Sequence, residues 1–165
     1  MAGKGNQKKN DAPEVHNRRA RHEYAIDETL EVGIKLVGTE VRSLRAGKGS
    51  LAEGYVRAEL EPPRLLLFGV HIDEYAPAGP VRAGRQHALR RARVLLAHGR
   101  EIRKLYTAQQ TKGVTIVPLR LYFNERGIAK VLIGVGRGKK AFDKREDIKK
   151  RETQREIQRQ MSRRL

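Results

Sequence analysis

Six arginines crowd one stretch of the chain in which no acidic residue occurs. There is no Asp or Glu from Tyr75 to Arg100, and the arginines are Arg82, Arg85, Arg90, Arg91, Arg93 and Arg100. A guanidinium presents a planar fork of N–H donors that pairs with phosphate oxygens and stacks on bases. Since like charges at this density repel one another, an anionic partner would stabilise the stretch. We interpret it as a loop whose Arg90, Arg91 and Arg93 contact a nucleic-acid backbone, with a solvated surface loop as the alternative.

The glycine-rich stretch from Gly134 to Lys140 has the residue types of a phosphate-binding loop but not its spacing. A P-loop needs a glycine five residues before its Gly-Lys pair, where this chain has Ile133, and a Ser or Thr where it has Lys140. The charged sequence that follows does not predict the crossover helix of a dinucleotide fold. We expect these glycines to let the backbone approach a neighbouring chain or a nucleic acid.

No group of side chains has the spacing of a catalytic or metal centre. The five histidines form no H-x-H or H-x-x-x-H set, cysteine is absent, and none of the three serines stands in a nucleophile elbow. Glu31 and Glu40 are the carboxylates that a metal-dependent nuclease would use, but such residues more often hold an N–H donor or an arginine. We therefore expect a protein that is not an enzyme and has no cofactor or metal.

The formal net charge of +17 is unevenly distributed. Residues 22–80 carry six basic and ten acidic side chains, residues 81–136 carry twelve and two, and residues 137–165 carry twelve and five. A concentration of positive charge in the later part of a chain favours a polyanionic partner. No apolar run approaches the roughly 18 residues of a membrane span, and no apolar signal segment begins the chain, so we expect a cytoplasmic protein.

The elements that must position these residues have the periodicity of a β-rich domain. Apolar residues occupy every second position from Tyr24 to Leu36 except at Glu28, which predicts one long, curved strand with a bulge or bend at Gly33. Two more strands are predicted on either side of Pro62–Pro63. The face of the second of these strands is predicted to carry Leu66, Phe68, Val70 and Ile72.

A last hairpin is predicted across residues 114–136, with its turn at 124–127 and with Pro118 at an edge or bulged position. Helices are predicted within residues 38–49 and 99–113. The order strand, helix, hairpin, loop, helix, hairpin lacks the regularity of β-α-β units. We therefore predict a mainly β fold with accessory helices, in the form of a small antiparallel barrel of the oligonucleotide-binding type with two to three helices and a basic C-terminal tail.

Five stretches of the chain, taken in order, resemble one protein family. They are NRRARHEY (17–24), GTEVRSLRAGK (38–48), LLAHGREI (95–102), LRLYF (119–123) and GKKAFDKREDIKKR (138–151). Together they resemble the SsrA-binding protein family, also called small protein B. The resemblance implies a bacterial factor that binds the tRNA-like domain of transfer-messenger RNA. With elongation factor Tu, such a factor delivers this alanyl-charged RNA to stalled ribosomes.

The resemblance also implies partners and site residues for this chain. The partners are transfer-messenger RNA and the ribosome, at its decoding centre and messenger channel, with elongation factor Tu and alanyl-tRNA synthetase linked only indirectly. A monomer with no membrane contact is expected. The residues implied to face RNA are Glu31, Leu96, His98, Gly138, Lys139 and Lys140. Some members have Asn where this chain has His98. The residues implied to contact the ribosome are Phe142, Asp143, Lys144, Arg145 and Met161.

Three parts are expected along the chain: a flexible basic arm over residues 1–16, an RNA-binding domain over 17–138, and a basic tail over 139–165. The tail is rich in helix formers. It has only a narrow apolar stripe, at Ile157, Met161 and Leu165, which is too narrow to dock on the domain. We expect the tail to be disordered in the free protein and helical inside the empty messenger channel, where phosphates would offset its charge.

Two other functions are compatible with this sequence. A ribosomal protein or initiation-type factor would combine a similar barrel with cationic tails but would bind ribosomal RNA stably. A metal-dependent nuclease that uses Glu31 or Glu40 is the more distant alternative. The RNA that co-purifies with the chain distinguishes the first of these from a factor for transfer-messenger RNA, and incubation of RNA with magnesium tests the second.

Overall fold

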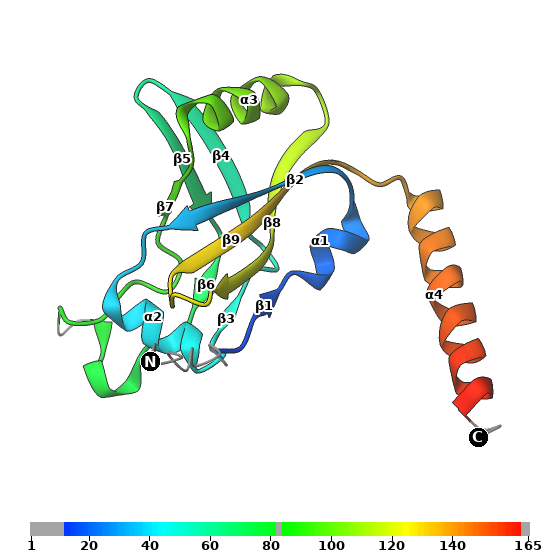
Figure 1. The fold of residues 1–165 in the computed structure, drawn as a ribbon, viewed down its shortest axis with the longest axis horizontal. Helices are drawn as coiled ribbons and strands as arrows, with labels where there is room; N and C mark the ends of the chain where they lie inside the picture. The colour runs from blue at the N-terminus through cyan, green and yellow to red at the C-terminus, as the bar shows by residue number, and fades with distance from the viewer. Residues whose placement is uncertain (1–11, 82–83, 163–165) are drawn as a thin grey trace, which may run out of the picture.

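A β-sheet forms the centre of the part of the chain that the computed structural model describes, residues 12–81 and 84–162 (Figure 1). The strands are β1 (Val15–His16), β2 (Tyr24–Ile34), β3 (Gly49–Ser50), β4 (Tyr55–Leu60), β5 (Pro63–Phe68), β6 (His71–Ile72), β7 (Arg93–Leu96), β8 (Val114–Phe123) and β9 (Ala129–Gly138). The helices are α1 (Arg18–Glu23), α2 (Gly38–Arg45), α3 (Gly99–Gln110) and α4 (Ala141–Ser162), with a 3-10 turn, η1 (Ala76–Ala78). The predicted fold class, mainly β with a few helices, is confirmed. None of the described helices is long and apolar enough to cross a membrane.

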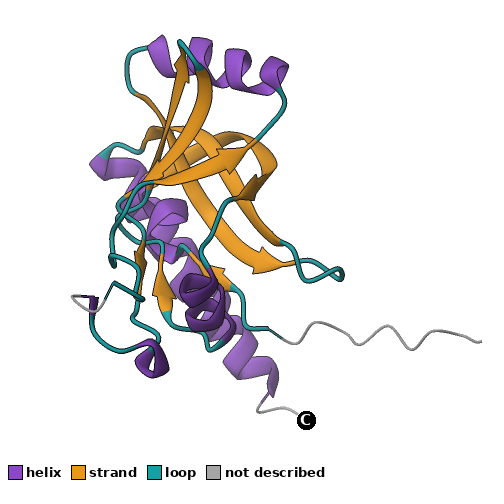
Figure 2. Cartoon of the chain, turned by 90° about the vertical axis from the view of Figure 1, so that its left-hand side faces the viewer, coloured by secondary structure: helices purple, strands orange, loops and turns teal. Residues whose placement is uncertain are grey.

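The last strand of the main sheet pairs with the second strand in its order. Its strand order is β1-β8-β4-β5-β7-β2-β9, and β9 also pairs with β8. Because β8 bonds to β4 along one edge and to β9 along the other, the strand pairings form a closed ring. All of these pairs are antiparallel. Helix α3 lies across one end of the strands in both views (Figures 1 and 2).

The bulge in the long strand β2 lies near its start and not at Gly33 as predicted. The register of β2 against β9 shifts between Ile26 and Glu28, where two residues of β2 oppose one of β9. The extra residue reverses which positions face inward. Tyr24 and Ile26 therefore pack outside the ring beneath α1, whereas Leu30 packs against the main core, although all three keep the same alternation in the sequence.

The hairpin of β8 and β9 agrees closely with its prediction. A second register shift lies between Pro118 and Arg120 in β8, which confirms a bulged position for the proline. Ile116, Val131 and Ile133 from this hairpin are completely buried in the main core. Complete burial of such a side chain contributes about 1.5–3 kcal/mol to stability. Burial of these side chains fixes the backbone of the hairpin, and this backbone positions the side chains of β8 and β9 that face outward.

The N-terminal boundary of the folded domain lies earlier in the chain than predicted. Val15 and His16 form strand β1 against β8, and the Asn17 side chain is buried. The Asn17 amide nitrogen donates to the carbonyl oxygens of Leu51 and Pro118 at 2.8 and 2.9 Å, respectively. Residues 15 and 16 therefore belong to the sheet, and the predicted arm boundary at residue 16 is wrong. Residues 1–11 lie outside the described part of the chain.

The arginine-rich stretch that was predicted to be a loop contains a strand. Strand β7 pairs with β5 on one side and with β2 on the other. Its side chains alternate, with Arg93 and Leu95 buried and Val94 and Leu96 exposed. The sequence does not predict this strand, because an arginine at one of its inward positions hides the apolar alternation.

Helix α4 stands apart from the sheet and follows the last residues of β9 (Figure 1). Its apolar side chains Ile148, Ile157 and Met161 are 42%, 53% and 67% exposed. These values agree with the expectation that the tail has no apolar face wide enough to pack on the domain. The helical backbone agrees with the abundance of helix formers, and disorder of the free tail stays a prediction.

Candidate nucleic-acid interface

Glu31 and Leu96 lie on the same outer face of the sheet. Gly33, two residues after Glu31, pairs with Leu96 of β7 on one side and with Lys130 of β9 on the other. A Cβ atom at Gly33 would lie 3.2 Å from the Leu96 Cβ, so the Leu96 side chain occupies the space above the glycine. Leu96 is 57% exposed, an unusual value for a leucine on a central strand. The structure thus brings together two residues that the resemblance implied to face RNA.

The carboxylate of Glu31 has two neighbours from the adjoining strands. The Tyr122 hydroxyl of β8 donates a hydrogen bond to it, and the Lys130 ammonium of β9 lies 3.6 Å from its other oxygen. Burial, followed by the hydrogen bond to Glu31, raises the pKa of Tyr122, so this hydroxyl keeps its proton. The Glu31 side chain remains 48% exposed and has lone pairs for a further donor. An RNA 2′-hydroxyl or a base amino group is a suitable donor.

A hollow of about 540 Å³ lies beside this carboxylate. Leu96 and Ile128, both more than half exposed, form apolar parts of its wall, and Gly33 and Lys130 also line it. Sequence reasoning missed Tyr122, Ile128 and Lys130. Tyr122 and Lys130 lie next to Glu31 because β9 pairs with both β8 and β2. The β8–β9 hairpin is predicted from the sequence, but its pairing with β2 is not, and Ile128 in the turn of the hairpin lines the hollow. The hollow combines apolar walls with a charged rim, which suits an unstacked nucleobase.

His98 lies close to the same face, two residues beyond Leu96, at the start of α3. Its backbone N–H donates to the Glu101 carboxylate at 2.7 Å, and its side chain is exposed. Helix α3 is also linked to β2 by an ion pair between Lys104 and Glu28. Glu31 and Leu96 therefore share one surface, and His98 follows two residues after Leu96. We name this surface the Glu31–Leu96 face.

The Gly138–Lys139–Lys140 segment lies at the other end of β9. Gly138 pairs with Tyr24 at the start of β2, eight residues along β9 from Lys130. At about 3.3 Å per strand residue, this places it roughly 26 Å from the Glu31–Leu96 face. The Lys139 N–H donates to the carbonyl oxygen of Glu23 at 2.8 Å, which fixes the chain where it leaves the sheet. The predicted RNA-facing residues therefore form two separate groups.

Arg93, which was predicted to contact RNA, is completely buried. Its Nε donates to Glu40 at 2.8 Å, and its two terminal nitrogens donate to the carbonyl oxygens of Val70 at 2.7 Å and Leu89 at 3.1 Å. A phosphate cannot reach a side chain with no exposed surface, so the prediction of an RNA contact for Arg93 is wrong. Its function in the fold is to join α2 to the chain before β7.

The arginines near Arg93 also have acidic partners. Arg91 donates to both oxygens of Glu40, at 2.8 and 2.5 Å, and Arg90 lies 2.7 Å from the Glu53 carboxylate. The stretch has no acidic residue of its own, and its ion-pair partners belong to α2 and to the residues before β4. The expectation that these arginines are without counter-charges is therefore wrong. Arg90 is exposed and Arg91 is partly exposed, whereas Arg82 lies outside the described residues.

Glu40 is the centre of this network and is itself completely buried. Burial opposes its ionisation, but hydrogen bonds from Arg91 and from the Val37 backbone, together with the charge of Arg93, outweigh burial and lower the pKa of Glu40. The carboxylate is therefore ionised at neutral pH and holds two guanidinium groups. This is the structural function that carboxylates more often have, and it confirms that alternative for Glu40.

The residues expected to contact the ribosome belong to α4. Phe142, Asp143, Lys144 and Arg145 are in the first turns of its backbone, and their side chains lie outside what the structure describes. Met161, near the other end of α4, is exposed. Among the side chains that the structure describes, no group of three or more His, Asp or Glu has an arrangement that would hold a metal ion.

Comparison with known proteins gives consistent matches over nearly the whole chain. A family model described as SmpB protein matches residues 14–163. The SsrA-binding protein of Moorella thermoacetica is 48% identical over 143 residues, which are 87% of this chain and 88% of that protein. The SsrA-binding protein of Thermobifida fusca is 46% identical over 166 residues, 99% of each chain. A chain in the solved structure "tmRNA-SmpB: a journey to the center of the bacterial ribosome" is 48% identical, with a TM-score of 0.65 over 79% of this chain and 87% of that one.

Proposed function

The chain belongs to the SmpB protein family, and on this premise we propose that it binds the tRNA-like domain of transfer-messenger RNA and delivers that RNA to stalled ribosomes for peptide tagging. The observation that carries the proposal is the Glu31–Leu96 face. There, residues from three parts of the sequence meet on a solvent-exposed surface. The SsrA-binding proteins and the tmRNA-SmpB structure, which this chain resembles along most of its length, support the identity of the RNA.

The Glu31–Leu96 face binds RNA through a small number of directed contacts. Glu31, held by Tyr122 and Lys130, accepts a hydrogen bond from a 2′-hydroxyl or a base amino group. Leu96 offers apolar surface to a base or sugar, and the exposed His98 ring stacks on a base or accepts from an RNA hydroxyl. These contacts bind an RNA and do not transform it, so the proposed activity requires no catalytic group or cofactor.

Positively charged groups elsewhere on the domain supply the sequence-independent part of the affinity. Arg90 and Arg91 retain exposed guanidinium surface although each has an acidic partner, and we include both among the RNA contacts. Gly138, Lys139 and Lys140 form a second contact region at the far end of β9. The closed ring of strands supports a barrel of the oligonucleotide-binding type as the scaffold for both regions.

The tail has a separate function on the ribosome. Helix α4 leaves the domain at the Lys139–Lys140 end and extends away from it (Figure 1). We infer that it occupies the empty messenger channel in the cytoplasmic ribosome. There, Phe142 and the Asp143–Arg145 segment contact the decoding centre and Met161 lies deeper in the channel. Because helix and messenger RNA cannot occupy the channel together, the tail reports that the channel is vacant. Elongation factor Tu and alanyl-tRNA synthetase act on the same RNA.

Sequencing of the RNA that co-purifies with the full-length chain tests the proposal. We expect one discrete RNA with a tRNA-like end. Enrichment of ribosomal RNA without it would favour a ribosomal protein or initiation-type factor instead. Intact RNA after incubation with magnesium or manganese is expected, whereas cleavage that disappears in Glu31→Ala would support a nuclease.

A point variant tests the Glu31–Leu96 face itself. Glu31→Ala should weaken binding of the tRNA-like RNA by roughly 10- to 100-fold, because a hydrogen bond to a charged acceptor contributes about 1.5–3 kcal/mol. Glu28→Ala on the same strand is the matched control, since it removes the same charge from an exposed ion pair with Lys104. The free energy of unfolding should change by less than about 1 kcal/mol in both variants. Equal affinities of the two variants would remove Glu31 from the interface.

A further inference from the structure

A second cavity, of about 590 Å³, opens between the start of α2 and the segment before β7. The charged side chains that line it are Arg42, Arg85 and Arg91, and no acidic side chain is among the described residues of its lining. Arg42 lies over the Tyr75 ring, with 5.2 Å between the guanidinium carbon and the ring centroid. Three guanidinium groups around one hollow produce a local positive potential that attracts an anion.

The wall of this cavity is fixed by hydrogen bonds to the domain. The two ring nitrogens of His87, which is 5% exposed, lie 2.9 Å from the Thr39 hydroxyl and 3.1 Å from the Ile72 carbonyl oxygen. The Gln86 amide donates to the carbonyl oxygen of Tyr75 at 2.9 Å. The segment that carries Arg85 and Arg91 is therefore held in place before any ligand arrives, which lowers the entropic cost of binding.

The three arginines differ in how much of their donor capacity is already used. Glu40 accepts from Nε and one terminal nitrogen of Arg91, so the other terminal nitrogen keeps its N–H donors. Within the described residues, neither Arg42 nor Arg85 has an ion pair with a carboxylate, in contrast to Arg90, Arg91 and Arg93. The cavity thus has one arginine oriented by a buried acid and two whose charge is not balanced by a carboxylate.

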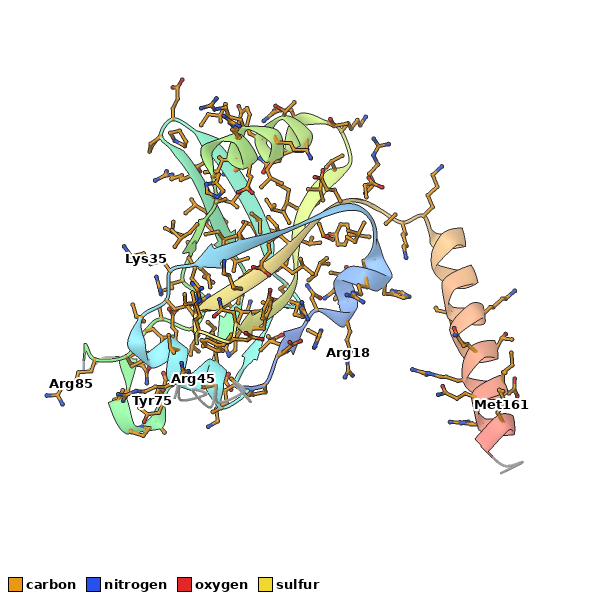
Figure 3. All side chains as sticks on the ribbon, viewed as in Figure 1. Arg18, Lys35, Arg45, Tyr75, Arg85 and Met161 are labelled. Carbon is orange, nitrogen blue, oxygen red and sulfur yellow. The ribbon has the colours of Figure 1, made fainter. Side chains whose placement is uncertain are left out.

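The cavity is close to the Glu31–Leu96 face. Val37, at the cavity, is four residues after Gly33, and four extended residues span at most about 14 Å. Lys35 lies between them, exposed, with its N–H bonded to the Val94 carbonyl oxygen at 2.9 Å. Figure 3 shows Lys35 and Arg85 at the same edge of the molecule. A nucleic acid on the Glu31–Leu96 face can extend its backbone past Lys35 into the cavity.

We propose that the cavity lined by Arg42, Arg85 and Arg91 binds a backbone phosphate of the same RNA that the Glu31–Leu96 face contacts. This inference rests on the proposed function. Guanidinium groups pair with phosphate oxygens through parallel N–H donors, and such contacts set the position and orientation of an RNA without reading its sequence. The cavity fixes the RNA relative to the domain, and the Glu31–Leu96 face supplies the contacts to bases and sugars.

The salt dependence of RNA binding tests this proposal. The variant is Arg42→Ala/Arg85→Ala in the full-length chain, with Arg91 kept because Glu40 depends on it. The control is Arg57→Ala/Arg155→Ala, which removes the same charge from exposed positions on β4 and α4. A transcript of the tRNA-like domain is titrated at several salt concentrations. Loss of one phosphate contact should reduce the slope of log affinity against log salt by about 0.7–0.9 in the variant alone.

Three outcomes decide between the proposal and its alternatives. An unchanged slope in the cavity variant, or an equal change in the control, overturns the proposal. A slope that changes for binding to vacant ribosomes but not for the tRNA-like transcript assigns the cavity to ribosomal RNA and also overturns it. If the wild-type chain does not bind the transcript at all, the proposed function fails. The slope is then measured on the RNA that co-purifies with the chain, which tests the cavity independently.

Discussion

The segment before β7 and helix α4 are both rich in positive charge, but they obtain their negative partners in different ways. Arg90 and Arg91 of the segment, and Arg93 at the start of β7, pair with Glu53 and Glu40, which are 37 to 53 residues away in the chain. In α4 the acids belong to the helix itself, at positions three or four residues from its basic residues. The segment is therefore tied into the domain, whereas the tail needs no contact with the domain to balance part of its charge.

Burial follows the same division between these two regions. Arg93 has no exposed surface, although arginine is rarely buried completely. Ile157 and Met161 on α4 are more than half exposed, although they are apolar. A residue's type and its immediate sequence neighbours therefore do not establish whether it is available to a partner. A basic side chain is accessible to a partner only where it is not already buried in an ion pair with a carboxylate from another part of the fold.

The largest expected effect concerns the tail. Ending the chain after Arg145 should abolish peptide tagging on stalled ribosomes and leave the affinity for the tRNA-like RNA unchanged, because α4 extends away from the sheet and the residues proposed to contact that RNA precede it. Tagging in a reconstituted translation system and RNA binding by gel shift provide the two measurements. Tagging at the wild-type level by the shortened chain would contradict the proposed function of α4.

The next effect concerns the contribution of Glu40 and its two arginines to the stability of the fold. Glu40→Ala leaves two guanidinium groups without their carboxylate, one of them completely buried. Breaking a buried ion pair by removing one partner costs about 3–5 kcal/mol, and we expect a loss of this size in the free energy of unfolding measured in urea. Glu53→Ala is the control, because its ion pair with Arg90 is exposed. Similar losses in both variants would show that burial does not distinguish the two pairs.

The same network predicts a dependence of stability on pH. The pKa of Glu40 is lowered in the folded chain, so between that value and the unfolded pKa of about 4.3 the unfolded chain binds more protons. The stabilisation is complete above about pH 4.3 and decreases as pH falls through the folded pKa. The difference in unfolding free energy between wild type and Glu40→Gln should therefore shrink on acidification below pH 4.3. A difference that stays constant down to pH 3 would be incompatible with a lowered pKa.

The smallest expected effect on stability belongs to Arg90. Arg90→Ala removes an exposed ion pair with Glu53 and should lower the free energy of unfolding by about 0.2–1 kcal/mol. As a proposed RNA contact, the same variant should reduce the salt slope of RNA binding by about 0.7–0.9. Thermal unfolding and salt titration measure the two effects separately. A salt slope equal to that of the wild-type chain would show that Arg90 does not contact the RNA.

The sequence by itself determined the features that depend on near neighbours in the chain. The existence of the long strand β2, the hairpin of β8 and β9 with its bulged Pro118, and the extent of α3 all agree with prediction. Periodicity and proline act through the local backbone, so they can be interpreted without knowing what packs nearby. The narrow apolar stripe of the tail was equally visible, since a helix presents every fourth residue on one side.

Which face of a strand points inward was decided partly by tertiary structure. Leu66 and Phe68 were predicted to share an inward face with Val70 and Ile72, but Leu65 and Leu67 are the buried residues of β5. Gly69, with a φ of +70°, follows the strand and changes the direction of the chain, so the alternation does not continue across it. The bulge near Ile26 had the corresponding effect in β2.

The partners of charged residues were decided entirely by tertiary structure. Glu40 meets Arg91 and Arg93 only because α2 packs next to the chain that enters β7, and Glu31 meets Tyr122 and Lys130 only because β9 pairs with both β2 and β8. Electrostatic attraction and hydrogen bonding depend on distance in space and not on separation along the chain. A pattern read along the sequence therefore located the cationic regions, and the fold determined which of those charges remain available to an RNA.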